Sequence, residues 1–68
     1  MKSMRRIIDE LKEMMGISHT KYLAEDLGFS YKTFRNRSTR NSIPFKQILD
    51  YCKDKDIDVM KLLYGGVK

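Results

Sequence analysis

The chain has 68 residues and a formal net charge of +5, from 14 lysine or arginine residues and nine acidic ones. We expect a single domain over residues 1–68, because this length excludes an assembly of several folded units. The composition, 41% hydrophobic and 34% charged, favours a globular chain over a disordered one. The basic excess permits a polyanionic partner but does not establish one.

The first predicted helix covers residues 4–15. The Ser3 hydroxyl can cap its free N–H groups, and Gly16 can end it in the left-handed conformation. Apolar residues at helical spacing predict its buried face, and charged residues occupy the other side. The apolar residues are Met4, Ile7, Ile8, Leu11, Met14 and Met15. A methionine stripe can also form an adaptable binding surface, and we favour core packing over that alternative.

Residues 20–40 predict a helix, a tight turn and a second helix. Gly28 can end the first helix, Phe29 forms the buried corner of the turn, and Ser30 can cap the second helix. The apolar face of the first helix consists of Leu23, Ala24 and Leu27. Ala24 is small enough to let the two helices cross closely. Together these features predict a helix-turn-helix motif.

The second helix of the motif, residues 31–38, points Phe34 back at the first helix. Four polar side chains then share its outward surface, by the spacing of helix neighbours: Tyr31, Lys32, Arg35 and Asn36. Arginine and lysine can donate to guanine, and asparagine can pair with adenine. In DNA-binding helix-turn-helix proteins the start of this helix enters the major groove. We therefore predict that these four residues read DNA bases.

Positive charge is concentrated around this helix. Between Leu27 and Leu49 there is no acidic residue, so this window carries the +5 of the whole chain. Its basic residues are Lys32, Arg35, Arg37, Arg40 and Lys46. A basic run is often only a solvated surface, but its place on this helix favours an electrostatic footprint for nucleic acid.

Thr20 and Lys21 lie at the start of the first helix of the motif, which we expect to begin at Ser18 or Thr20. Helix N-termini attract phosphate, and this helix crosses the DNA backbone in such proteins. We predict phosphate contacts for both residues. The polar connection 38–42 and the following helix offer further backbone contacts, although an ordinary loop is the alternative for the connection. The residues concerned are Arg40, Asn41 and Lys46.

Two shorter predicted helices complete the chain. Pro44 fits the first turn of the fourth helix, and Asp58 can cap the fifth, which Gly65 and Gly66 close. The apolar stripe of the fourth helix consists of Phe45, Ile48, Leu49 and Cys52. The fifth helix is rich in apolar residues, from Val59 to Tyr64, which fits either core packing or a partner surface.

The residues that could bind a metal or carry catalysis are isolated. His19 and Cys52 are the only histidine and cysteine, and they lie on different predicted helices. We expect no enzyme, metal, cofactor or small-molecule substrate. No apolar run is long enough to cross a bilayer, so we expect no membrane contact and a cytoplasmic, nucleoid-associated protein.

Three stretches resemble the N-terminal domain of phage CI repressors, within the lambda-repressor-like helix-turn-helix fold. They are LAEDLGFSYKTFRNR (23–37), SIPF (42–45) and IDVMKLLYGG (57–66). Many helix-turn-helix families share LA-x-x-LG-x-S, whereas SIP at a fixed distance and the LL-x-G ending are more specific. The resemblance implies a compact all-α domain of five helices that binds a palindromic double-stranded DNA operator as a homodimer and represses transcription. It fits a stand-alone regulator or the N-terminal part of a longer repressor.

The resemblance also places Ser30 and Thr33 at the DNA backbone. The chain departs from the family at Arg37 and Lys61, where tryptophan is frequent. Our hypothesis for Arg37 is a buried stem with its guanidinium directed at a phosphate. The alternative function is a small protein-interaction module that uses the same fold without binding DNA. Such a module would carry apolar anchors on the outward surface of residues 31–38, and RNA binding would need exposed stacking aromatics besides Tyr31.

Overall fold

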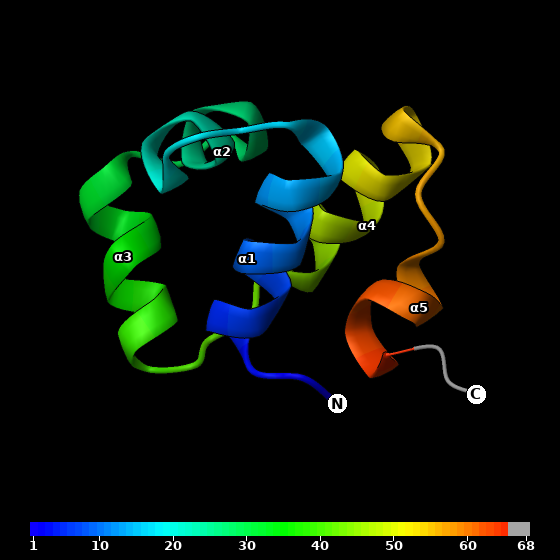
Figure 1. The fold of residues 1–68 in the computed structure, drawn as a ribbon. Helices are drawn as coiled ribbons and strands as arrows, with labels where there is room; N and C mark the ends of the chain where they lie inside the picture. Colours follow the sequence, from blue (N-terminus) through cyan, green and yellow to red (C-terminus); the bar gives the residue numbers. More distant parts are fainter. Residues whose placement is uncertain (66–68) are drawn as a thin grey trace.

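The computed structural model describes residues 1–65, which form five helices and no strand (Figure 1). The helices are α1 (Met4–Met15), α2 (Thr20–Leu27), α3 (Tyr31–Thr39), α4 (Phe45–Lys55) and α5 (Val59–Tyr64). This confirms the all-α prediction of five helices. Gly66, predicted to help close α5, lies outside the described residues. Within residues 1–65 no helix combines the length and apolar character needed to cross a membrane.

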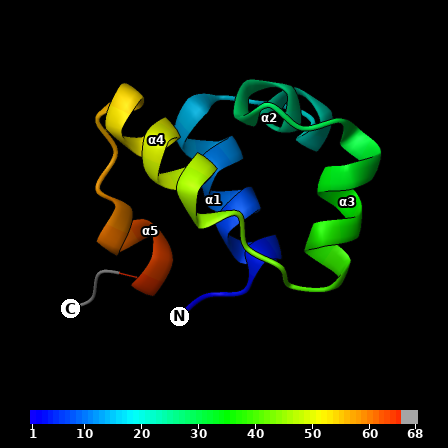
Figure 2. The same cartoon turned by 180° about the vertical axis from the view of Figure 1, so that it is seen from behind.

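Helix α1 lies at the centre of the molecule, between α3 on one side and α4 and α5 on the other (Figures 1 and 2). The N-terminal segment runs beside α5, where the Lys2 N–H donates to the Leu63 carbonyl at 2.8 Å. All five helices contribute to one core. Its buried residues are Met4, Ile7, Ile8, Leu11, Leu23, Ala24, Leu27, Phe34, Ile48, Tyr51, Cys52, Leu62 and Leu63.

Most predicted helix ends are confirmed by their hydrogen bonds. The Ser3 hydroxyl accepts from the Arg6 N–H at 3.3 Å, and Asp58 Oδ1 accepts from the Met60 N–H at 3.1 Å. Gly16 and Gly28 end α1 and α2 with φ of 67° and 88°, values that cost glycine no Cβ clash.

Helix α2 begins at Thr20, one of the two predicted starts, and its cap is His19, whose Nδ1 accepts from the Lys21 N–H at 3.0 Å. Two predicted boundaries are displaced. Helix α3 runs one residue further than predicted, to Thr39. Pro44 caps α4 instead of lying in its first turn, because its ψ of 79° is not helical.

Two predicted apolar faces need correction. Phe45 and Leu49 are 43% and 48% exposed, whereas Tyr51, which the stripe omitted, is buried. The inward face of α4 is centred on Ile48, Tyr51 and Cys52, at i, i+3 and i+4, and the other two apolar residues lie on its flank. On α1, Met14 likewise lies on the flank of the inward face and is exposed.

Candidate nucleic-acid interface

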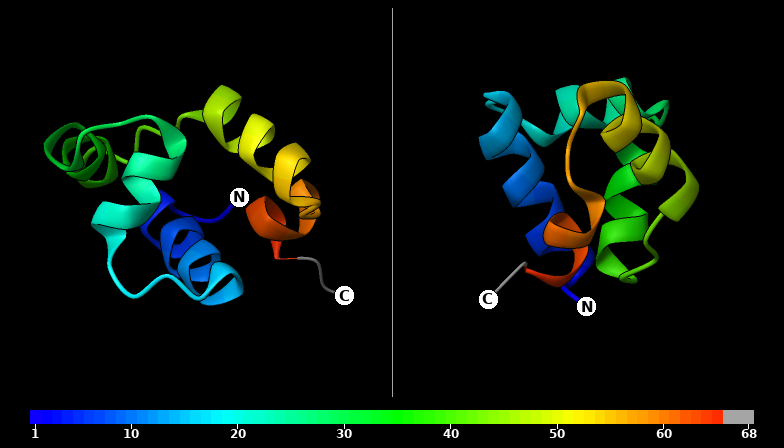
Figure 3. Two further views of the ribbon diagram at one scale, coloured as in Figure 1. Left: turned by 90° about the horizontal axis from the view of Figure 1, so that it is seen from above. Right: turned by 90° about the vertical axis from the view of Figure 1, so that its right-hand side faces the viewer.

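Helix α3 lies at the edge of the molecule farthest from α5, as the left view in Figure 3 also shows. Its inward side is held by Phe34, which is 1% exposed and stacks on Phe29 with 5.7 Å between ring centroids. Phe29, predicted as the buried corner of the turn, is partly buried and packs against the core. Ala24 is fully buried on α2, and its carbonyl accepts from the Phe29 N–H at 2.8 Å, which fixes the turn.

The outward face of α3 carries the side chains predicted to read bases. Each of the four is exposed: Tyr31, Lys32, Arg35 and Asn36. Ser30 caps the helix, because its hydroxyl oxygen accepts from the Thr33 N–H at 3.2 Å. The Ser30 hydroxyl also donates to Thr33 Oγ1 at 2.9 Å. The hydroxyl proton of Thr33 is therefore the free donor of this pair.

The basic residues around α3 are available for a polyanion. Among residues 1–65, ion pairs join Lys2 and Arg6 to Glu10, and Lys55 to Asp54. In this described part of the chain, none of the five basic residues of the 27–49 window takes part in an ion pair. Their positive charge therefore has no partner within the described fold.

A groove of about 210 Å³ separates α3 from α1. Its polar rim includes Arg5 and Asp9 from α1, Thr20 from α2, and Tyr31 and Arg35 from α3. The sequence analysis placed Arg5 among the charged residues opposite the apolar face of the first helix and gave it no role. Helical spacing shows that Arg5 is off the core face, but it does not show which neighbouring helix lies beside it.

The start of α2 faces the start of α3. The His19 ring lies edge-on to the Tyr31 ring with 5.6 Å between centroids, so this histidine both caps α2 and contacts the other helix. Lys21 is exposed beside it. Thr20 is partly buried, and its hydroxyl oxygen accepts from Lys12 Nζ at 3.3 Å, which leaves the hydroxyl proton as a donor.

A second hollow, of about 270 Å³, lies at the C-terminal end of α3. It brings together five polar residues: Thr33, Asn36, Arg37, Arg40 and Ser42. The Arg37 guanidinium carbon lies 5.6 Å from the centroid of the Phe29 ring. Asn41 does not line this hollow, because its Oδ1 accepts from the Met4 N–H at 2.7 Å. Lys46 is exposed at the start of α4.

A family model for the bacteriophage CI repressor helix-turn-helix domain matches residues 6–66. The chain belongs to this family. Comparisons with curated protein sequences and with solved structures gave no match. As a phage CI repressor helix-turn-helix domain, the chain is a DNA-binding domain of the repressor type and not an enzyme.

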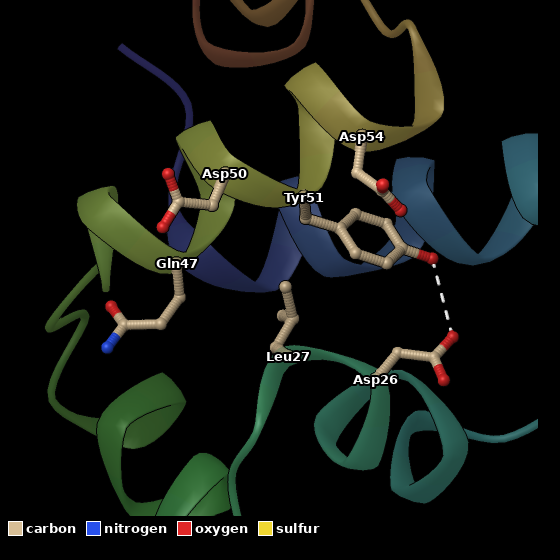
Figure 4. A pocket seen from close by; sticks show the side chains of 6 residues that line it. All are labelled: Asp26, Leu27, Gln47, Asp50, Tyr51 and Asp54. Carbon is tan, nitrogen blue, oxygen red and sulfur yellow. Dashed lines mark hydrogen bonds between the residues drawn. The ribbon is translucent and has the colours of Figure 1, made fainter.

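The acidic side of this CI repressor domain lies between α2 and α4. There Asp26, Asp50 and Asp54 surround a hollow of about 250 Å³, and the Tyr51 hydroxyl donates to Asp26 at 3.5 Å (Figure 4). Burial first, and then this carboxylate, raises the pKa of Tyr51. Residues 1–65 hold no group of three or more histidine, cysteine or acidic side chains placed to bind a metal.

Proposed function

We propose that this CI repressor domain binds a palindromic operator as a homodimer, with α3 of each copy in the major groove, and represses transcription. The observation that carries the proposal is the outward face of α3. Four exposed polar side chains lie together on this face. The helix that carries them is capped at its start and anchored by Phe34. Tyr31, Lys32, Arg35 and Asn36 are the proposed base-reading residues.

The proposed backbone contacts surround this face. Thr20 and Lys21 approach phosphates from the start of α2, where helix N–H groups also favour an anion. The remaining backbone contacts are assigned to Ser30, Thr33, Arg37, Arg40, Asn41 and Lys46. For Asn41 the donor is the amide nitrogen, because its oxygen is engaged by Met4. To this set we add Arg5, on account of its place in the groove beside Tyr31 and Arg35.

The dimer is proposed to form through α5. Met60 and Tyr64 are 61% and 58% exposed and lie four residues apart, so they share one side of this helix. Because α5 lies at the end of the molecule away from α3, a two-fold axis near α5 would hold the two α3 helices apart (Figures 1 and 2). Two separated reading helices are what the two half-sites of a palindrome require.

A protein-interaction module remains the competing function. It would need apolar anchors on the outward face of α3, and Tyr31, at 39% exposure, is the one aromatic side chain exposed on α3 within the described residues. The exposed apolar residues of α4 and α5 do not favour that function over self-association.

A salt-titrated selection from a randomised duplex pool tests the proposal, with the bound fraction sequenced. Enrichment of a two-fold symmetric motif is the expected result. A steep salt dependence without an enriched motif would overturn sequence-specific binding and leave only the electrostatic attraction. Failure to bind any duplex at low salt would overturn the proposal and favour the interaction module.

A further inference from the structure

Histidine is not among the residue types that usually cap a helix. Helices α1, α3 and α5 are capped by residues of the usual types, Ser3, Ser30 and Asp58. Helix α2 is capped instead by His19, whose Nδ1 accepts from the Lys21 N–H at 3.0 Å. A serine or an asparagine would supply an equivalent acceptor, so the cap alone does not account for the imidazole ring.

The imidazole ring of His19 contacts two tyrosine rings. The centroid of the Tyr31 ring lies 5.6 Å away, at an interplanar angle of 62°, and that of the Tyr22 ring lies 6.4 Å away, at 77°. Both are edge-to-face arrangements, within the distances at which aromatic rings attract one another. Because Tyr31 is the first residue of α3, the contact joins the cap of α2 to the start of the proposed reading helix.

The backbone of α2 fixes the direction of the His19 ring. The ring cannot turn about its own axis without breaking the bond between Nδ1 and the Lys21 N–H. The His19 carbonyl also accepts from the Tyr22 N–H at 3.0 Å, which ties the residue to the first turn of the helix. Since an imidazole nitrogen that accepts a hydrogen bond carries no proton, the neutral ring has its proton on Nε2. The ring that contacts Tyr31 is therefore held in place before any DNA binds.

Tyr31 receives little restraint from the core. It is 39% exposed, whereas Phe34 on the same helix is 1% exposed. A side chain that is free to rotate loses that freedom on binding, and the loss costs affinity. A neighbouring ring that holds Tyr31 in one orientation removes this cost for the base that the orientation fits, and not for other bases. The contact with His19 thus affects specificity as well as stability.

We propose that His19 is a positioning residue for base recognition, which holds the Tyr31 ring in the orientation that reads a base. This role rests on the proposed function, in which Tyr31 lies in the major groove. It assigns no base or phosphate to His19 itself, and it adds a residue outside α3 to those that determine the operator sequence. Loss of the His19 ring should relax the preference at one base pair per half-site and leave the other preferences unchanged.

Two substitutions of His19 separate the ring from the cap. His19→Asn keeps a side-chain acceptor and removes the ring, so its free energy of unfolding in urea should stay close to that of the natural chain. His19→Phe keeps an aromatic ring and removes the acceptor. Nuclear magnetic resonance of the free chain measures Overhauser contacts between the side chains of residues 19 and 31. We expect ring-to-ring contacts in the natural chain and in His19→Phe, and their absence from the natural chain would overturn the proposal.

The base preferences give the decisive test, measured as affinities for the selected operator and its single-base variants. Tyr31→Ala identifies the base pair that Tyr31 reads. At that base pair, His19→Asn should lower the discrimination against wrong bases by about two- to tenfold, the range for one aromatic pair, and His19→Phe should lower it less. The double variant of His19→Asn and Tyr31→Ala should lower it no further than Tyr31→Ala alone, because the two changes remove one interaction.

The matched control is Ser3→Asn, which exchanges one capping residue for another on α1 and should preserve every preference. Unchanged preferences in His19→Asn or in Tyr31→Ala would overturn the positioning role and leave operator binding intact. An equal loss over all duplexes in His19→Asn would also overturn it, because His19 would then act through stability or charge. Selection of no motif by the natural chain would overturn the proposed function, and the positioning role with it.

Discussion

The Asn41 side chain connects the turn after α3 to the start of α1, because its Oδ1 accepts from the Met4 N–H at 2.7 Å. The first N–H groups of a helix have no partner within the helix, and Asn41 supplies one from a residue 37 positions away. Asn41 has a φ of 55°, a left-handed value that asparagine tolerates better than most residues. One residue thus shapes the turn beside the candidate interface and caps the central helix.

Substitution of Asn41 should separate these two roles. We expect Asn41→Ala to lower the free energy of unfolding by about 1–2 kcal/mol, because it removes the cap and places a Cβ in the left-handed region. Asn41→Gly also removes the cap but relieves the backbone, so its loss should be smaller. Urea denaturation of both variants measures this. Equal stability of all three chains would show that the hydrogen bond to Met4 contributes nothing.

Arg35 is the residue on which we expect base recognition to depend most. Arg35→Ala should cost about 1–3 kcal/mol of operator affinity and relax the base preference at one position, if the guanidinium pairs with guanine. Binding isotherms against the selected operator and its single-base variants measure this. Lys53→Ala, which removes an exposed positive charge from α4, is the control. An equal loss over all duplexes would mean that Arg35 contacts only phosphate.

The neighbouring residues Arg5 and Arg6 give a matched pair for the backbone contacts. Arg5 lines the groove beside α3. Arg6 instead forms an ion pair with Glu10, with 3.6 Å between Arg6 Nε and Glu10 Oε2. We expect Arg5→Ala to weaken binding to all duplexes and to reduce the slope of log affinity against log salt by about 0.9, the value for one phosphate. Arg6→Ala should leave the slope unchanged. Equal effects of both variants would show that only net charge matters.

The sequence was sufficient to predict the helices of this domain because their ends are set locally. Ser3, Ser30 and Asp58 each cap a helix through N–H groups two or three residues further on. Gly16 and Gly28 end helices through their own backbone freedom. Such signals lie within one helical turn, so they can be identified without knowing the rest of the fold. The exposure of the α3 face was predictable for the same reason, because Phe34 fixed the inward direction.

The features that were missed depend on the way separate helices pack. Helical spacing predicted Phe45 on the buried face of α4 and omitted Tyr51, and only contact with the rest of the core decides that Tyr51 is buried. The location of Arg5 beside α3, and the bond from Asn41 to Met4, join residues far apart in the chain. The hollow around Arg37 likewise requires the turn to fold back at Ser42. None of these relationships leaves a local pattern.

The buried thiol of Cys52 should make the free energy of unfolding depend on pH in the alkaline range. Cys52 is 2% exposed, and burial raises the pKa of its thiol above the usual 9.0. The unfolded chain therefore loses this proton first, so the stabilisation is complete below about pH 8 and is lost as the pH rises through the folded-state pKa. Urea denaturation at about pH 8 and about pH 10 measures this effect. Over that range the free energy of unfolding should fall less for Cys52→Ala than for the natural chain. An equal fall in the free energy of unfolding of the two chains would show that this thiol makes no contribution.

The proposed dimer makes a prediction for Met60. In a two-fold interface the same residue enters from both copies, so Met60→Glu would introduce two carboxylates into an apolar contact. We expect about tenfold weaker binding to the full operator, unchanged binding to an isolated half-site, and loss of the two-to-one complex in analytical ultracentrifugation. Met14→Glu, altered at a methionine that is 51% exposed on α1, is the control and should preserve the complex. A two-to-one complex that survives Met60→Glu would show that the copies meet elsewhere, with the flank of α4 at Phe45 and Leu49 as the next surface to test.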